Sequence, residues 1–257
     1  MVGKVTSFAL IVFLFSSCTV LEDRGDCPCL LHLDFDESAA AVADSVRIWV
    51  RGDGFNFTSG LSSSNYSEGI TITVTSRSGV YVTVMDSASA QDSPDGSLAI
   101  APGCQCPQVY DFRAFCDTSG ETAREYVSLH KNHCRVLLSF PEAMSGGYSV
   151  EIAGSACGYS GLGDILDGDF SCIPSADGKG LFVFCIPRQK DALLNMSIGT
   201  DDGLPRIFAL GNFILESGYD WTAGDLEDVE VEVDYAASPV RLDIEGWPER
   251  DASDIVI

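Results

Sequence analysis

The chain has 257 residues, with 38 acidic against 15 basic side chains and a formal net charge of −23 at pH 7. This excess of negative charge repels phosphate backbones and anionic lipid headgroups, which argues against nucleic acid as a ligand. Because 46% of the residues are hydrophobic, we expect a globular protein rather than an acidic disordered tail.

The first 17 residues have the layout of a secretory signal peptide that ends at Cys18. Lys4 supplies the positive charge, residues 5–15 are apolar, and two serines precede the cysteine. The apolar run is about half the roughly 20 residues that a membrane-spanning helix needs. We therefore expect export, cleavage before Cys18 and attachment of acyl chains such as palmitate to its thiol. Ordinary secretion with an unmodified cysteine is the alternative, because Phe15 and Ser17 depart from the commonest lipoprotein cleavage motif.

Residues 18–26 are a short polar tether that carries three acidic side chains, Glu22, Asp23 and Asp26. Acidic residues directly after a lipidated cysteine resemble the sorting signals that send lipoproteins to the outer face of the outer membrane in Bacteroides-type bacteria. A plain hydrophilic spacer is the alternative. The expected location is the cell outer membrane, with the protein exposed at the surface.

From Cys29 onward, apolar and polar residues alternate, as in strands with one buried face. Turn-forming residues at 51–54 and 93–96 separate some of these runs. We expect an antiparallel β-sandwich domain over residues 27–120. Its predicted strands lie at residues 29–35, 46–50, 70–74 and 80–84.

A polar stretch at residues 117–125 interrupts the alternation and is the predicted linker to a second β-sandwich, residues 121–257. A glycine-rich loop is expected at residues 158–168. The predicted strands of this domain lie at residues 127–129, 136–140, 148–152, 181–185, 194–198, 229–235 and 240–244. With no long amphipathic helix, the pattern indicates an all-β protein of two tandem sandwiches. The C-terminal tail, residues 249–257, is our candidate for an additional edge strand. Its last residues, Asp254, Ile255, Val256 and Ile257, are the candidate partner-strand region.

Nine cysteines remain beside Cys18, an odd number in a chain expected to leave the cytoplasm. Two pairs, Cys27-Pro28-Cys29 and Cys104-Gln105-Cys106, could together supply four thiolates to zinc, but zinc sites usually space their cysteines more widely. Buried free thiols or disulfides are favoured, since an oxidising compartment promotes disulfides. Four cysteines of the second half are candidates to pair among themselves: Cys134, Cys157, Cys172 and Cys185.

Signatures of catalysis are missing from the sequence, so we expect a protein that is not an enzyme and holds no cofactor or metal. His32, His130 and His133 have no evident catalytic partner. Three aspartates, Asp164, Asp167 and Asp169, do not follow the order of a calcium-binding loop, and a solvated loop is favoured. The aromatic residues that could stack on sugar rings, but are more often packed in a core, are Trp49, Tyr66, Tyr81, Trp221 and Trp247.

Several local patterns coincide, in order and spacing, with one family. Cys18 is followed by Cys27-Pro28 and by the sequence LHLDF at residues 31–35. Further matches are SGVYVTV at 78–84, VSLHKNHCRV at 127–136 and VRLDIEGW at 240–247. Together they resemble the fimbrillin-A-associated anchor proteins, the fimbrial anchor lipoproteins of Bacteroides-type bacteria.

The resemblance implies two transthyretin-like, Greek-key β-sandwiches on a lipid tether at the base of a fimbrium used for adhesion. The implied partner is fimbrillin, the stalk subunit, whose strand would complete an open sheet edge by β-augmentation. Such a join combines backbone hydrogen bonds with apolar burial, so it should dissociate slowly. The acyl chains would transmit force to the outer membrane.

Two other functions stay open at this point. A surface glycan-binding lipoprotein would need exposed aromatic residues such as Trp49 or Trp221 to line a groove. An exported hydrolase would need two carboxylates about 5–10 Å apart in a cleft.

Overall fold

The computed structural model describes most of the chain that follows residue 26. The described ranges are 27–90, 93–140, 148–177, 180–200, 204–233, 240–243 and 250–252. Several predicted features lie outside them: the signal peptide, the tether of residues 18–26 with the lipidation site Cys18, the aromatic candidate Trp247, and the candidate partner strand Asp254, Ile255, Val256 and Ile257.

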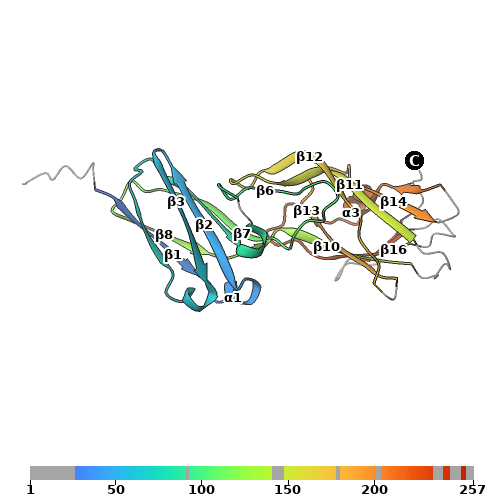
Figure 1. The fold of residues 1–257 in the computed structure, drawn as a ribbon, viewed down its shortest axis with the longest axis horizontal. Helices are drawn as coiled ribbons and strands as arrows, with labels where there is room; N and C mark the ends of the chain where they lie inside the picture. The colour runs from blue at the N-terminus through green and yellow to red at the C-terminus, as the bar shows by residue number, and fades with distance from the viewer. Residues whose placement is uncertain are drawn as a thin grey trace, which may run out of the picture.

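Two β lobes are joined end to end, with β1 at one end of the molecule and β14 toward the other (Figure 1). The strands of the first lobe are β1 (Cys29–Phe35), β2 (Ser45–Gly52), β3 (Phe55–Ser62), β4 (Ile70–Val74), β5 (Val80–Asp86), β7 (Tyr110–Cys116), β8 (Thr122–Val127) and β9 (His130–Lys131). Those of the second lobe are β6 (Leu98–Ala99), β10 (His133–Ser139), β11 (Tyr148–Tyr159), β12 (Ile165–Cys172), β13 (Phe182–Pro187), β14 (Asn195–Thr200), β15 (Arg206–Phe208), β16 (Val229–Val233), β17 (Val240–Asp243) and β18 (Arg250–Ala252).

Helical segments in the described part of the chain are short. They are α1 (Ala39–Val42), the 3₁₀ turn η3 (Ser63–Asn65), α2 (Ser87–Ala90) and α3 (Leu210–Glu216). None of the described helices has the length and apolar character needed to cross a membrane. The all-β prediction is confirmed.

In the first lobe, a three-stranded sheet, β4-β1-β8, faces a five-stranded sheet, β3-β2-β5-β7-β9, across one apolar core. The side chains that meet between the sheets are mostly the alternating residues seen in the sequence. Burying each valine, leucine or isoleucine contributes about 1.5–3 kcal/mol, which drives the two sheets together. Members of this core include Cys29, Leu31, Leu33, Val46, Ile48, Val50, Ile72, Val74, Val80, Val82 and Val84.

The second lobe repeats the strand order of the first. Its sheets are β13-β10-β16-β17-β18 and β12-β11-β14-β15. The strand order β4-β1-β8 of the first lobe corresponds to β13-β10-β16 here, and the order β3-β2-β5-β7 corresponds to β12-β11-β14-β15. Strands β17 and β18 extend the first of these sheets beyond the repeat. Each lobe therefore consists of two facing sheets with the same order of strands.

The sequence analysis expected antiparallel sheets, but some of the strand pairs are parallel. In each lobe, the first strand pairs parallel with a late strand: β1 with β8 and β10 with β16. Alternation reveals buried faces but carries no information on strand direction, so the parallel pairs were not predictable from it.

The polar stretch at residues 117–125, predicted to be the linker, contributes instead to the first lobe. Thr122–Val127 forms β8, whose exposed edge position tolerates polar side chains such as Arg124. The hydrogen-bonded strands place the passage between the lobes at residues 131–133, after β9, rather than at 120–121. The expected glycine-rich loop is also shorter, because β11 and β12 leave only residues 160–164 between them.

Candidate functional site

The segment of residues 98–106 crosses from the first lobe and lies along the second before the chain returns to β7. We call it the crossover segment. Its backbone bonds strands of both sheets of the second lobe: the amide of Ile100 donates to the carbonyl of Cys157 (2.8 Å), that of Gly103 to Ser171 (2.9 Å), and that of Cys106 to Cys185 (3.0 Å). The chain therefore joins the lobes three times.

Glycine makes this close approach possible. Gly158, opposite Ala99 in the β6–β11 pairing, has a φ of 141°, a conformation that other residues rarely adopt. A Cβ at this position would overlap the carbonyl oxygen of Leu98. Any larger residue at 158 would push the crossover segment away from β11.

A buried polar network fixes the third crossing, around Asn132. The hydroxyl of Tyr159 donates to the carbonyl of Asn132 (2.6 Å) and accepts from the amide of Arg188 (2.7 Å). The Arg188 guanidinium in turn donates to the Asn132 side-chain oxygen (2.8 Å) and to the carbonyls of Trp221 and Ala223. Since Tyr159 is fully buried, these partners replace the water that it would otherwise bind.

Two carboxylates clamp the same passage from the loop before β16. Asp225 accepts from the backbone amide of Lys131 (2.7 Å), and the amide of Leu226 donates to the Lys131 carbonyl (3.0 Å). Asp228 pairs with the ammonium of Lys131 and with the guanidinium of Arg135, at 2.8 Å from Nη2. Burial alone would raise the pKa of Asp228, but the two cations outweigh it and hold the pKa below its usual value.

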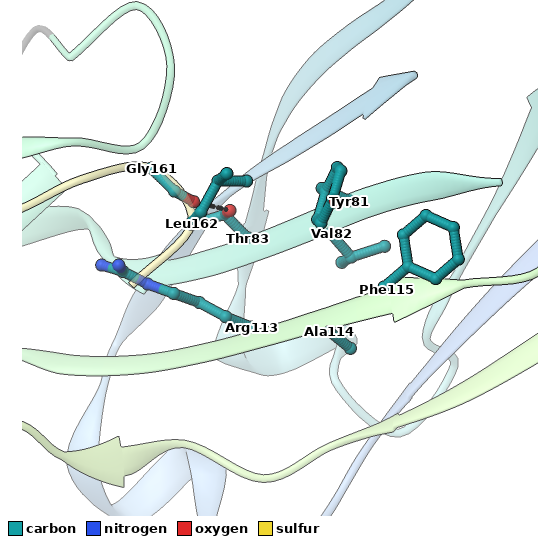
Figure 2. Close-up of a pocket in the computed structure, with 8 residues that line it drawn as sticks. All are labelled: Tyr81, Val82, Thr83, Arg113, Ala114, Phe115, Gly161 and Leu162. Carbon is teal, nitrogen blue, oxygen red and sulfur yellow. Dashed lines mark hydrogen bonds between the residues drawn. The ribbon is translucent and has the colours of Figure 1, made fainter. Parts of the chain in front are cut away.

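The loop of residues 160–164 rests on the outer face of the first lobe's larger sheet. Thr83 donates from Oγ1 to the carbonyl of Gly161 at 2.6 Å (Figure 2). The guanidinium of Arg113 donates to the carbonyl of Ser160. Arg113 also pairs with Asp111 at 2.8 Å, and burial raises the pKa of that carboxyl group. This contact buries Thr83 on a sheet face that alternation predicts to be open to solvent.

Beyond this contact, the same sheet face carries an exposed apolar patch. Tyr81 and Phe115 lie edge to face with ring centroids 5.1 Å apart, and Leu162 of the loop completes the patch (Figure 2). Their exposed fractions are 46%, 56% and 51%. The small pocket between them has a volume of about 150 Å³.

The tryptophans singled out for glycan binding are packed inside the protein. Trp49 is fully buried where the larger sheet of the first lobe meets the junction. Trp221 lines a groove of about 470 Å³ with Tyr219 and Lys190, but only 6% of its surface is exposed. A ring so covered cannot present its face to a sugar.

The other residues considered for chemistry are separated. His32 bonds Thr71, His130 bonds Asp225, and His133 is buried with Nδ1 3.1 Å from the carbonyl oxygen of Val109. Of the three aspartates considered for calcium, Asp164 bonds Ser160 and Asp167 pairs with Lys190. In the part of the chain that the structure describes, no three acidic, histidine or cysteine side chains gather as metal ligands.

The two C-x-C pairs do not form one site. Cys29 lies in the core of the first lobe and Cys106 in that of the second, whereas Cys27 and Cys104 are exposed. All nine described cysteines are free thiols in this structure.

Strand β3 is an unusual sheet edge. Among the described strands it pairs only with β2, and its eight residues, FNFTSGLS, contain neither a charge nor a proline. Natural edge strands are commonly blunted by charge, proline or short length. Of the other described sheet edges without charge, β4 has five residues, and β13 has six and is bonded by the crossover segment at Cys185. The sequences of the remaining edges, β8, β9, β12, β15 and β18, contain charged residues.

The chain is similar to known proteins in fold but not in sequence: no protein-family model and no curated protein matches it. A candidate polysaccharide-binding protein from Bacteroides thetaiotaomicron aligns with a TM-score of 0.66 and 13% identity, covering 89% of this chain and 99% of its own. A candidate adhesin from Bacteroides ovatus has a TM-score of 0.61 and 14% identity, covering 88% and 95%. The fimbrial anchor protein Mfa2 from Porphyromonas gingivalis has a TM-score of 0.60 and 12% identity, covering 88% and 100%.

These alignments span both lobes. The resemblance to fimbrial anchor proteins that the sequence motifs indicated is thus confirmed at the level of the fold.

Arg188 offers a direct test of the junction. Arg188→Ala leaves the carbonyls of Trp221 and Ala223 without their charged donor, so we expect the free energy of unfolding to fall by about 2–4 kcal/mol. Arg188→Lys keeps the charge but not the planar fork and should recover only part of the loss. The control is Arg124→Ala, which breaks an exposed pair with Asp34 and should cost under about 1 kcal/mol. Equal losses in urea unfolding for Arg188→Ala and Arg124→Ala would contradict this role.

The Asp228 clamp predicts a pH dependence. Because the folded pKa of Asp228 is lowered, its stabilisation is present above the unfolded value of about 3.8 and is lost as the pH falls through the folded value. Asp228→Asn removes the titrating group. We expect this variant to be less stable than the wild type at pH 7 and the difference to shrink below about pH 4. Urea unfolding between pH 3 and pH 7 measures it, and a difference independent of pH would show that the ion pairs contribute nothing.

Proposed function

We propose that this protein is a non-enzymatic accessory subunit of a surface fimbrium, anchored in the outer membrane by acyl chains on Cys18 and exposed at the cell surface. The observation that carries the proposal is the match of both lobes to solved fimbrial and adhesion proteins over nearly the whole chain. The signal peptide and its terminal cysteine support the lipid anchor.

Within this proposal, the lobes are two tandem transthyretin-like, Greek-key sandwiches. The recurrence of one strand order in both lobes supports a repeated domain. The parallel pairing of the first strand with a late one in each lobe supports it further, because such a pair is uncommon in a mostly antiparallel protein.

The arrangement of the lobes suits a mechanical link. Strand β1 begins at the end of the molecule that lies away from the second lobe (Figure 1). Arg77 holds this start by donating to the carbonyls of Cys27 (2.9 Å) and Gly120 (3.2 Å). A force applied between the tether and the second lobe would therefore pass through the junction around Asn132.

Fimbrillin, the polymerising subunit, would join by β-strand addition at an open edge. Strand β3 is the acceptor that we propose, because it is the longest uncharged open edge among the described strands. An added strand would gain one ladder of backbone hydrogen bonds, and its side chains would lie beside the half-buried Phe57 and Leu61.

Glycan binding is the second candidate. It is favoured by the groove beside Trp221 and by the exposed pair Tyr81 and Phe115. However, the Trp221 ring is almost fully covered, and Tyr81 and Phe115 line only a small pocket. These features support glycan binding less well than the fold supports a fimbrial role.

The anchor is tested by Cys18→Ser in the native cell. Without a thiol there is no acylation, so we expect the variant to leave the membrane fraction and the polymerised fimbrillin to be shed with it. The matched control is Cys27→Ser, an exposed cysteine nearby that should leave both in place. Fractionation and co-purification from gently sheared cells measure both. A wild-type protein that never co-purifies with fimbriae would refute the proposed function.

The acceptor edge is tested by placing lysines on β3. Thr58→Lys with Gly60→Lys adds two charges at exposed positions, and a side chain at Gly60 meets only ordinary contacts, so the fold should persist. We expect binding of purified fimbrillin to weaken roughly tenfold or more, because charges on an edge oppose strand addition. The control, Thr122→Lys, adds a charge at an exposed position of the β8 edge and should bind normally. Equal affinities for all three proteins would exclude β3.

A further inference from the structure

We propose that Cys106 and Cys185 form a disulfide in the mature protein and so bind the crossover segment covalently to β13. The Cys106 amide donates to the Cys185 carbonyl at 3.0 Å, and the Cys185 amide is 3.3 Å from the side-chain oxygen of Gln105. A backbone bond of this kind places the two Cα atoms on the order of 5–6 Å apart, within the range that a disulfide spans. Both thiols are buried, with exposed fractions of 2% and 6%.

The register of β10 and β13 shows which face of the sheet carries Cys185. Cys185 lies opposite Arg135, and Val183 two residues before it is exposed, so these side chains share the outer face of the sheet. Gln105 and Cys106 hydrogen-bond the backbone of Cys185, so the crossover segment runs directly beside it.

The same register separates Cys185 from Cys134. Cys134 lies opposite Ile186, so its side chain points to the inner face while that of Cys185 points outward. Cys172 belongs to the other sheet, where it pairs with Gly103 rather than with Cys106. Burial raises the pKa of Cys106, and the thiols of Cys185, Cys172 and Cys134 raise it further, so the pairing is decided by the backbone contacts and not by this shift.

The reaction is a thiol–disulfide exchange. The two cysteine thiols form one S–S bond and pass two electrons and two protons to a donor disulfide, which is released as two thiols. Burial also raises the pKa of Cys185, to about 11, so thiolate is scarce in the folded protein. The bond should therefore form while the chain folds and resist reductants afterwards.

In the cell this inference rests on the proposed export, because a reducing compartment would keep both thiols free. The geometric part does not depend on location. The experiment below separates the two by using protein from cells and protein refolded with a glutathione redox buffer.

Tryptic mapping identifies the bond, because trypsin places the relevant cysteines in different peptides. Cys185 lies alone in residues 180–188, Cys106 shares 78–113 with Cys104, and Cys172 lies in 136–179. The full-length protein is purified without reductant, its free thiols are alkylated in denaturant, and the digest is analysed by mass spectrometry. We expect peptide 78–113 linked to 180–188, and the same link in Cys104→Ser, which removes the other cysteine of that peptide.

The refolded sample is prepared from reduced, denatured protein in oxidised and reduced glutathione. We expect the same link to form there, and the midpoint of thermal unfolding to be higher than that of Cys185→Ser by roughly 5–10 °C. Cys157→Ser is the control and should keep the link. Free Cys106 and Cys185 after refolding, or a link from 78–113 to 136–179, would overturn the pairing. A link formed on refolding but absent from cellular protein would overturn the proposed export.

Discussion

The buried polar junction around Tyr159 is the constraint on which the rest of the structure depends. The chain passes between the lobes three times, and the passage at Asn132 brings backbone groups against the fully buried Tyr159. Those groups must be bonded inside the protein, because an unpaired buried donor or acceptor costs about 1–3 kcal/mol. The Arg188 guanidinium donates hydrogen bonds to the carbonyls of Trp221 and Ala223, and the Tyr159 hydroxyl donates one to the carbonyl of Asn132.

A junction of this kind restricts the motion of one lobe relative to the other, so it does not act as a hinge. Interfaces between domains of one chain are often small and polar and allow relative motion. Here the crossover segment adds backbone bonds to β11, β12 and β13, and the carboxylates of Asp225 and Asp228 hold the passage at Lys131. The proposed bond between Cys106 and Cys185 would act on the same connection. The proposed fimbrial role, in which the subunit would carry tension from a membrane to a fibre, requires this stiffness.

The sequence predicted the buried faces of the strands well and the junction poorly. Alternation identified the core residues of β1, β2 and β5, because one buried face is a local property of a strand. It failed where a second surface covers the outer face, as at Trp49 and Thr83. It also chose the wrong face of β13, where Val183 is exposed and Phe182 and Phe184 are buried. It also missed β3, β7, β8 and β12, and the short strands β6, β9 and β15. Contacts of residues 98–106 with β11 to β13 join positions far apart in the chain, and no local pattern encodes them. The one signal that pointed toward the junction was the motif at residues 127–136, which contains Asn132 and Lys131.

The central claim, that the two lobes behave as one mechanical unit, is tested most directly by differential scanning calorimetry of the full-length protein. Two weakly joined domains unfold separately and give two transitions. If the junction couples them as described, a single transition is expected, with a calorimetric enthalpy equal to the van 't Hoff enthalpy. Two resolved transitions, each with part of the total enthalpy, would contradict the account.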